Sequence, residues 1–119
     1  MVQPSCPALV VHDDDAFRKQ LIAALDQRNF TVTFEDDGVG AVELLKTRSF
    51  RVVLVGVNLG TRKGVRTLDF LRDGRTCAVI VLGDPDPGIR TLAPWADETM
   101  LKPVDPAYVA TRARVYCER

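Results

Sequence analysis

The chain lacks features that several protein classes require. Its longest apolar runs, residues 52–55 and 77–82, are far too short to cross a bilayer, so no membrane partner is expected. Neither sign of charge is in excess, because sixteen basic residues balance sixteen acidic ones, and direct nucleic-acid binding is therefore not predicted. The first residues show no basic segment followed by an apolar stretch, so no signal peptide is visible and we expect a cytoplasmic location.

Cysteine is also scarce. The three cysteines Cys6, Cys77 and Cys117 share no CxxC or CxxH spacing, so metal binding by cysteine is not expected. An odd number of cysteines without a signal peptide predicts reduced thiols. We interpret Cys77 as a small hydrophobic residue at the edge of a strand, with Cys6 and Cys117 near the ends of the chain.

What is present has the size and composition of one globular domain. The 119 residues are 46% hydrophobic and 27% charged, and a chain of this length buries a core without disulfides or metal. It contains no linker, internal repeat or low-complexity segment. We therefore predict a single domain over residues 1–119.

Short apolar runs alternate with segments of helical periodicity. Five segments have the pattern of strands: residues 8–11, 31–34, 52–55, 78–82 and 100–101. Asp14 or Asp15 is predicted to cap a helix that runs to about Gln27, and Asp105 to cap the last helix. Strands and helices that alternate five times predict an α/β fold, a doubly wound (βα)5 five-stranded parallel sheet.

In such sheets ligands bind at the carboxyl ends of the strands. The residues at or just after those predicted ends are His12, Asp13, Gly56, Gly83 and Lys102. The functional argument therefore depends on these five positions.

The motifs, taken in order, resemble a bacterial response-regulator receiver domain over essentially the whole chain. They are an opening strand with its acidic pair at residues 9–14, a turn into the second helix at 36–41, the loop after the phosphoacceptor at 57–60 with Gly64, and a final strand with its Lys-Pro at 96–104. The resemblance implies a flavodoxin/CheY-like sheet with strand order 2-1-3-4-5. It also implies a cis bond between Lys102 and Pro103.

The resemblance further implies phosphorylation of an aspartate with Mg²⁺, but this chain departs from the residues that perform it. The position of the family's phosphoacceptor is Gly56, which has no side chain to attack a phosphoryl donor. The first of the family's two magnesium-binding acids is His12, which leaves Asp13 as the only acidic ligand beside the backbone carbonyl of Asn58.

Two further family positions are replaced. The hydroxyl residue that would bind the phosphoryl group is Gly83, and the switch aromatic is Thr99, whereas Lys102 is kept. We therefore interpret the chain as a degenerate receiver, a pseudo-receiver, which is not an enzyme and has no catalytic residue, metal or cofactor. The remnants of the receiver pocket are His12, Asp13, Gly56, Asn58, Gly83, Lys102 and Pro103.

Each polar remnant has a structural and a functional interpretation. We favour an ion pair between Lys102 and Asp13 over a phosphate clamp. We favour His12 as a polar residue bonded to neighbouring acids over a substitute phosphoacceptor or pH sensor. Asp84 and Asp86 are interpreted as turn residues rather than as mimics of a phosphoryl charge.

Three residues form a candidate interface: Trp95, Thr99 and Tyr108. In receivers, the fourth helix, last strand and last helix usually meet partners. For Trp95, a binding anchor and partial burial against the last helix remain open alternatives. The scattered arginines are interpreted as a solvated surface rather than a site for an acidic partner or a cyclic dinucleotide.

The favoured function is a module of two-component or phosphorelay signal transduction that binds a protein partner without aspartyl phosphorylation. The partner could equally be another domain of a longer regulator or hybrid kinase. One alternative is a receiver that is phosphorylated on a substitute acceptor near Asp13. Another is a nucleotide-binding regulatory domain, which ranks last because the loops lack a run of Ser, Thr and Gly to hold phosphate.

Overall fold

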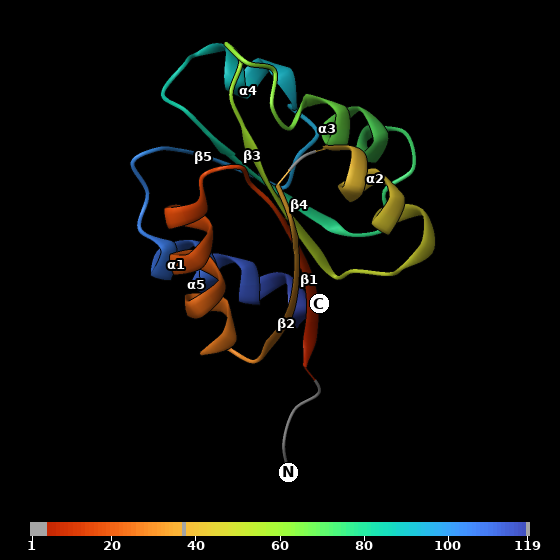
Figure 1. The fold of residues 1–119 in the computed structure, drawn as a ribbon, viewed down its shortest axis with the longest axis vertical. Coiled ribbons are helices and arrows are strands. Elements are labelled where there is room, and N and C mark those ends of the chain that lie inside the picture. Colours follow the sequence, from red (N-terminus) through yellow and green to blue (C-terminus); the bar gives the residue numbers. More distant parts are fainter. Residues whose placement is uncertain (1–4, 37, 119) are drawn as a thin grey trace.

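The computed structural model describes residues 5–36 and 38–118, in which strands and helices alternate throughout. The elements are β1 (Cys6–Val11), α1 (Asp15–Asp26), β2 (Phe30–Glu35), α2 (Gly38–Thr47), β3 (Val52–Val57), α3 (Val65–Arg72), β4 (Ala78–Gly83), α4 (Gly88–Leu92), β5 (Glu98–Leu101) and α5 (Pro106–Cys117). The five strands are parallel and lie in the order β2-β1-β3-β4-β5 (Figure 1). The predicted fold and strand order are confirmed.

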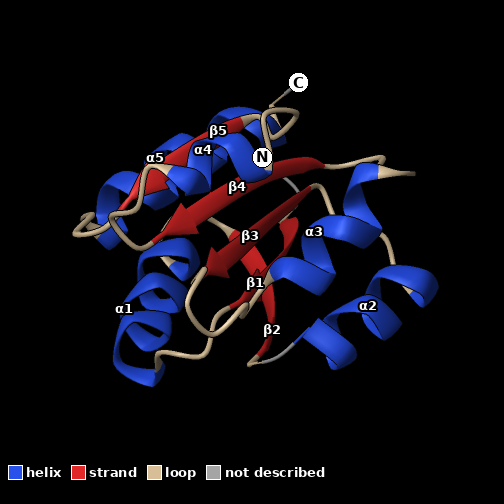
Figure 2. Ribbon diagram, turned by 90° about the horizontal axis from the view of Figure 1, so that it is seen from above, coloured by secondary structure: helices blue, strands red, loops and turns tan. Residues whose placement is uncertain are grey.

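Helices cover both faces of the sheet. α1 and α5 pack side by side on one face, and α2 and α3 pack on the other (Figures 1 and 2). α4 contributes Ile89 to the core on the side of α2 and α3. β1, β3 and β4 are buried almost throughout because they are covered on both faces, and this explains their continuous apolar runs.

Side-chain caps fix where the first and last helices begin. The Asp14 carboxylate accepts a hydrogen bond from the Phe17 N–H at 3.1 Å, ahead of α1. The Asp105 carboxylate accepts one from the Ala107 N–H at 3.0 Å, ahead of α5. Each cap satisfies a backbone donor that the first turn of a helix leaves unpaired, so both predicted capping positions are confirmed.

The strands extend beyond the predicted apolar runs. Gly56, which we expected to open a loop, is paired with Leu82, and Val57 is paired with Gly83. Both glycines therefore lie within strands, because backbone pairing does not require a side chain. Asp37 of the predicted turn lies outside the described residues. Within the described ranges, no helix is long and apolar enough to cross a bilayer.

The cysteines contradict the prediction of reduced thiols. Cys6 in β1 and Cys117 in α5 form a disulfide, with their Cα atoms 6.0 Å apart. The two residues are 111 positions apart, so only the packing of the first strand against the last helix brings them together. Cys77 keeps a free thiol and is half-buried before β4. Burial raises the pKa of the Cys77 thiol and is a larger influence than the nearby charges.

Candidate functional site

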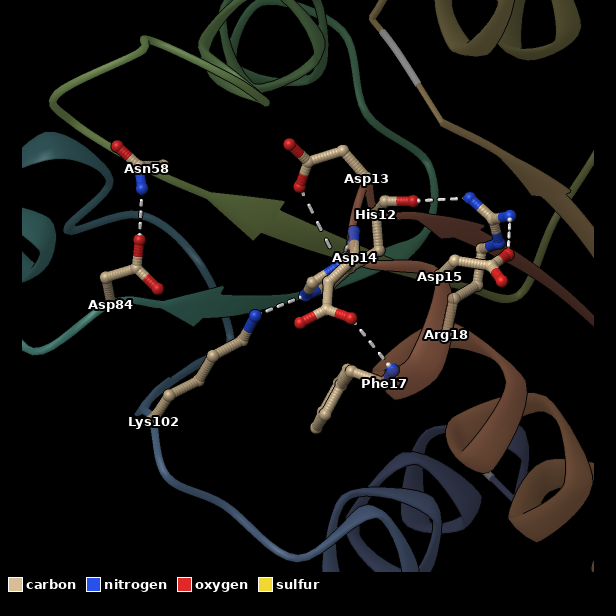
Figure 3. Close-up of polar contacts among 9 residues, drawn as sticks. All are labelled: His12, Asp13, Asp14, Asp15, Phe17, Arg18, Asn58, Asp84 and Lys102. Carbon is tan, nitrogen blue, oxygen red and sulfur yellow. Dashed lines mark hydrogen bonds and ion pairs between the residues drawn. The ribbon is translucent and has the colours of Figure 1, made fainter.

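The predicted site residues from three strand ends meet at the carboxyl edge of the sheet. His12 follows β1 directly, Gly56 lies near the end of β3, and Lys102 follows β5. The Lys102 N–H donates to the Gly83 carbonyl at 2.8 Å, which ties the end of β5 to the end of β4. The bond between Lys102 and Pro103 is cis, as predicted. Figure 3 shows the Lys102 side chain reaching from this loop to His12.

The imidazole of His12 occupies the space above Gly56. His12 is 3% exposed, and a Cβ built on Gly56 would lie only 2.9 Å from His12 Cγ and 2.9 Å from Nε2. Heavy atoms at such distances overlap, so a side chain at position 56 requires the ring to move. The large residue at one position thus fills the volume left by the small residue at the other. A histidine and a glycine that replace two aspartates were the sequence signal for this compensation, and our sequence analysis missed it.

Lys102 contacts His12 rather than Asp13, so the predicted ion pair is wrong. Lys102 Nζ lies 2.6 Å from His12 Nε2. The Asp13 side chain is 49% exposed, and its Oδ1 lies 4.0 Å from His12 Nδ1, on the side of the ring away from the nitrogen that faces Lys102.

The predicted hydrogen bonds between His12 and neighbouring carboxylates are also absent from the described part of the chain. Its Nδ1 accepts from the backbone N–H of Asp14 at 3.0 Å, and the Lys102 amine faces Nε2 (Figure 3). Two donors therefore face a ring that has a single lone pair when it is neutral and none when it is protonated.

Burial is the main reason that His12 stays neutral. Burial, followed by the charge of Lys102, lowers the pKa of His12 from 6.5 to about 4, against an opposing effect of the nearby carboxylates of Asp13, Asp14 and Asp84. Phe17 completes the surroundings: its ring centroid is 5.0 Å from that of His12 and 4.8 Å from Lys102 Nζ. At neutral pH the site therefore consists of a neutral imidazole and a lysine packed against an aromatic ring.

The space beside Gly83 is filled in the same way. A Cβ built on Gly83 would lie 2.5 Å from Cγ2 and 3.0 Å from Cγ1 of Ile89, a residue of α4 that is 1% exposed. An apolar side chain thus occupies the place where the family's hydroxyl residue would project. The sequence analysis did not find Ile89, because nothing local to it indicates which strand it packs on.

The carboxylates near this edge do not fit a magnesium site. Asp84 accepts a short hydrogen bond from the Asn58 side-chain amide (Figure 3), and Asn58 Oδ1 accepts from the Thr61 N–H at 3.0 Å. Within residues 5–36 and 38–118, no group of three or more His, Cys, Asp or Glu side chains converges to hold a metal. Magnesium requires an octahedral shell of oxygen atoms, and Asp13 alone supplies little of it.

The two aspartates after β4 act in the loop, as we had interpreted them. Asp86 Oδ1 accepts from the Gly88 N–H at 2.8 Å, which is a turn contact at the start of α4. Asp84 holds the loop after β3 through Asn58.

Pro103 and Lys102 line a mostly apolar cavity of about 360 Å³ with Phe17, Pro85 and Val104.

The candidate interface residues do not form one patch. Trp95 is half-buried on the side of α2, α3 and α4, with the Arg75 guanidinium 5.5 Å from its ring. Partial burial is therefore correct for Trp95, but burial against the last helix is wrong. Tyr108 is 54% exposed on α5, which covers the opposite face, and Thr99 is half-buried in the edge strand β5 between them.

Comparison with known proteins agrees with the fold. The family model described as Response regulator receiver domain matches residues 8–114. The transcriptional regulatory protein SrrA of Staphylococcus aureus is 25% identical over 114 residues, covering 93% of this chain and 47% of SrrA. This chain thus spans about half the length of the curated relatives that it matches.

Two solved structures illustrate the likeness. The receiver domain of Francisella response regulator 1452 superposes with a TM-score of 0.84 at 22% identity, covering 97% of this chain and 98% of that one. The signal receiver domain of a signal transduction histidine kinase from Syntrophus aciditrophicus gives a TM-score of 0.82 at 20% identity, covering 96% and 91%. At these identities the likeness concerns the fold.

Proposed function

Because the chain belongs to the response regulator receiver domain family, a family of signalling domains, we propose that it is a pseudo-receiver. It acts in two-component or phosphorelay signalling by binding a protein partner or another domain of a longer regulator or hybrid kinase. It does so in the cytoplasm, without aspartyl phosphorylation and without catalysing a reaction of its own.

The position of the His12 ring over Gly56 carries this proposal. Transfer of a phosphoryl group to a receiver needs a carboxylate nucleophile and cations that neutralise the gathering negative charge. At Gly56 there is no nucleophile, and the space for one is filled by a buried imidazole. Lys102, the family residue that is kept, is engaged by that same imidazole.

The contacts at the carboxyl edge also support a single signalling conformation. Lys102 Nζ lies against the His12 ring, the loops after β3 and β4 are joined through Asn58 and Asp84, and Ile89 packs beside Gly83. In this proposal, partner binding depends on the amount of the protein or on its attached domains, and not on a phosphoryl switch.

Labelling with a small phosphodonor tests the proposal. Wild-type protein is incubated with acetyl phosphate and Mg²⁺, and the mass of the intact chain is followed with time. We expect no phosphorylated species. Labelling that disappears in Asp13→Asn would instead establish a substitute acceptor near Asp13 and would overturn the proposal.

Repair variants sharpen this test. Gly56→Asp alone is expected to label slowly, because the new side chain meets the His12 ring and lacks a second acidic ligand. Gly56→Asp combined with His12→Asp removes the overlap and restores the acidic pair, and we expect labelling faster by on the order of 100-fold. Equal rates for the single and double variants would contradict this explanation of the silent site.

Restoring the hydroxyl residue requires a further change. Gly83→Thr brings a Cβ into Ile89, so it is made together with Ile89→Ala in the repaired background. Without the change at Ile89, we expect Gly83→Thr to give no additional rate. This pair of variants separates a missing hydroxyl group from a blocked position.

The partner-binding part of the proposal is tested separately at the exposed Tyr108. In pull-downs, Tyr108→Ala is expected to weaken capture of the partner about tenfold, because a large exposed aromatic residue on α5 is a typical binding anchor. Lys19→Ala, at an exposed position of α1, is the matched control. If both variants capture the partner equally well, α5 is not the binding surface.

A further inference from the structure

The amino edge of the sheet, opposite the His12–Lys102 pair, carries chemistry that the proposed function does not use. The disulfide joins Cys6, the first residue of β1, to Cys117, the last residue of α5. α5 returns antiparallel to the strands, so its final turn lies where the strands begin. The bond thus connects β1, an interior strand of the sheet, to the end of α5.

A cavity of about 430 Å³ opens directly over this disulfide. Both cysteines line it, together with three charged residues, Arg51, Arg114 and Glu118. The formal charge of the described lining is positive, because two guanidiniums face one carboxylate. Arg51 is fixed at the cavity by a hydrogen bond from its Nη2 to the Cys117 carbonyl at 3.1 Å, and Arg114 Nε lies 3.8 Å from Glu118 Oε1.

The two sulfur-bearing residues differ in access. Cys6 is 5% exposed, whereas Cys117 is half-buried in the last turn of α5. The more exposed Cys117 is therefore the residue that we expect a thiolate in the cavity to attack, with Cys6 as the leaving group. Nearby guanidiniums favour exchange at this disulfide, because they attract an anionic thiol and stabilise the thiolate that departs.

We propose that this cavity is a thiol–disulfide exchange site for a small anionic thiol of the glutathione class. In the first step, the thiolate of the small thiol attacks Cys117 Sγ, the bond between the two cysteine sulfurs breaks, and Cys6 leaves as a thiolate that takes up a proton. In the second step, another small thiolate attacks the small-thiol sulfur of the mixed disulfide and releases Cys117. Two small thiols are oxidised to one disulfide, and the protein disulfide is reduced to two thiols.

Glutathione redox buffers test the exchange on the full chain. The protein is equilibrated at several ratios of reduced to oxidised glutathione, quenched with acid, denatured and alkylated, and its intact mass is measured. We expect one alkylated thiol, Cys77, in oxidising buffers and three in reducing buffers. One thiol in every buffer, or three in every buffer, would overturn the proposal.

A trapping variant tests the order of attack. In Cys6→Ser the Cys117 thiolate attacks oxidised glutathione and releases one reduced glutathione, and no Cys6 thiol is present to displace the glutathione that stays bound. One glutathione should therefore remain on Cys117, where peptide mapping locates it. Cys117→Ser is the matched variant, and we expect at least tenfold less loading on the buried Cys6. Equal loading of the two variants contradicts the assigned direction.

The role of the cavity charge is tested by comparing two thiols. Arg51→Gln is expected to slow reduction by glutathione at least threefold more than reduction by 2-mercaptoethanol, which carries no charged group besides its thiolate. Arg51→Lys keeps the charge and should restore the glutathione rate. Arg66→Gln, at an exposed position of α3, is the control. If Arg51→Gln slows both thiols equally, or neither, the cavity does not select an anionic thiol and the proposal fails.

Discussion

The carboxyl and amino edges of this sheet hold their polar residues in different ways. At the carboxyl edge, His12 and Ile89 fill the space over Gly56 and Gly83, and the remaining lysine contacts a neutral imidazole. At the amino edge, a cavity of about 430 Å³ lies open over a disulfide and two arginines. At the carboxyl edge, side chains fill the space beside two glycines, whereas at the amino edge a covalent bond lies beside a cavity lined by charged residues.

The difference shows how a fold survives the loss of the residues that a family uses. The two apolar clusters of the core cover the two faces of the sheet, and Ile89, which fills the space beside Gly83, belongs to one of them. Strand ends can therefore change without disturbing the buried sheet, provided that neighbouring side chains fill the volume. The carboxyl edge should respond to pH and to added volume, and the amino edge to loss of the covalent bond.

Removing the disulfide should give the largest effect. Cys6→Ser with Cys117→Ser is expected to lower the free energy of unfolding by about 2–5 kcal/mol, because the bond closes a very long loop in the unfolded chain. Cys77→Ser, which leaves the bond intact, should cost less than about 1 kcal/mol. Urea unfolding without reductant measures both, and equal costs would show that the covalent bond contributes nothing.

Acid should act at the other edge. The pKa of His12 is about 4 in the folded protein, whereas an unfolded chain has the ordinary histidine value of 6.5, so the unfolded chain binds the proton first as pH falls. This contribution to stability is complete above pH 6.5 and decreases towards pH 4, by about 3 kcal/mol in total.

His12→Gln isolates that contribution. The variant has no titrating ring, so its stability should depend less on pH between 6.5 and 4 than that of the wild type. Urea unfolding at intervals across this range gives the two curves. Parallel curves would contradict a buried, neutral His12.

Added volume at Gly56 should come next in size. Gly56→Ala is expected to cost about 2 kcal/mol, because its Cβ displaces the buried His12 ring. In a His12→Ala background the same change should cost less than about 1 kcal/mol. A double-mutant cycle measures the difference, and an additive result would mean that the ring does not fill the space above Gly56.

The smallest expected effect is electrostatic. Lys102→Met should raise the pKa of His12 from about 4, because Lys102 is one of the two causes that lower it, but burial, the larger cause, should keep it below 6.5. Nuclear magnetic resonance of the imidazole is unambiguous, since His12 is the only histidine. Lys19→Met, on the exposed side of α1, is the control. An unchanged midpoint in Lys102→Met would show that the two side chains do not interact.

Features that depend on nearby residues were predicted correctly. Asp14 and Asp105 each cap a helix by accepting a hydrogen bond from an N–H group that is only two or three residues away in the chain. The apolar runs of β1, β3 and β4 were found because burial on both faces selects the same residue types at consecutive positions. The family motifs added the strand order and the cis bond at Lys102.

Features that depend on packing between distant segments were decided only by the tertiary structure. The sequence placed His12, Gly56 and Lys102 at one edge. It did not show that the His12 ring would cover Gly56, or that Lys102 would contact His12 instead of Asp13. Likewise, the sequence did not show that Cys6 and Cys117 would form a disulfide. Local periodicity fixes which way a residue faces within its own element, whereas its partner is set by the register and packing of elements that are far apart in the chain.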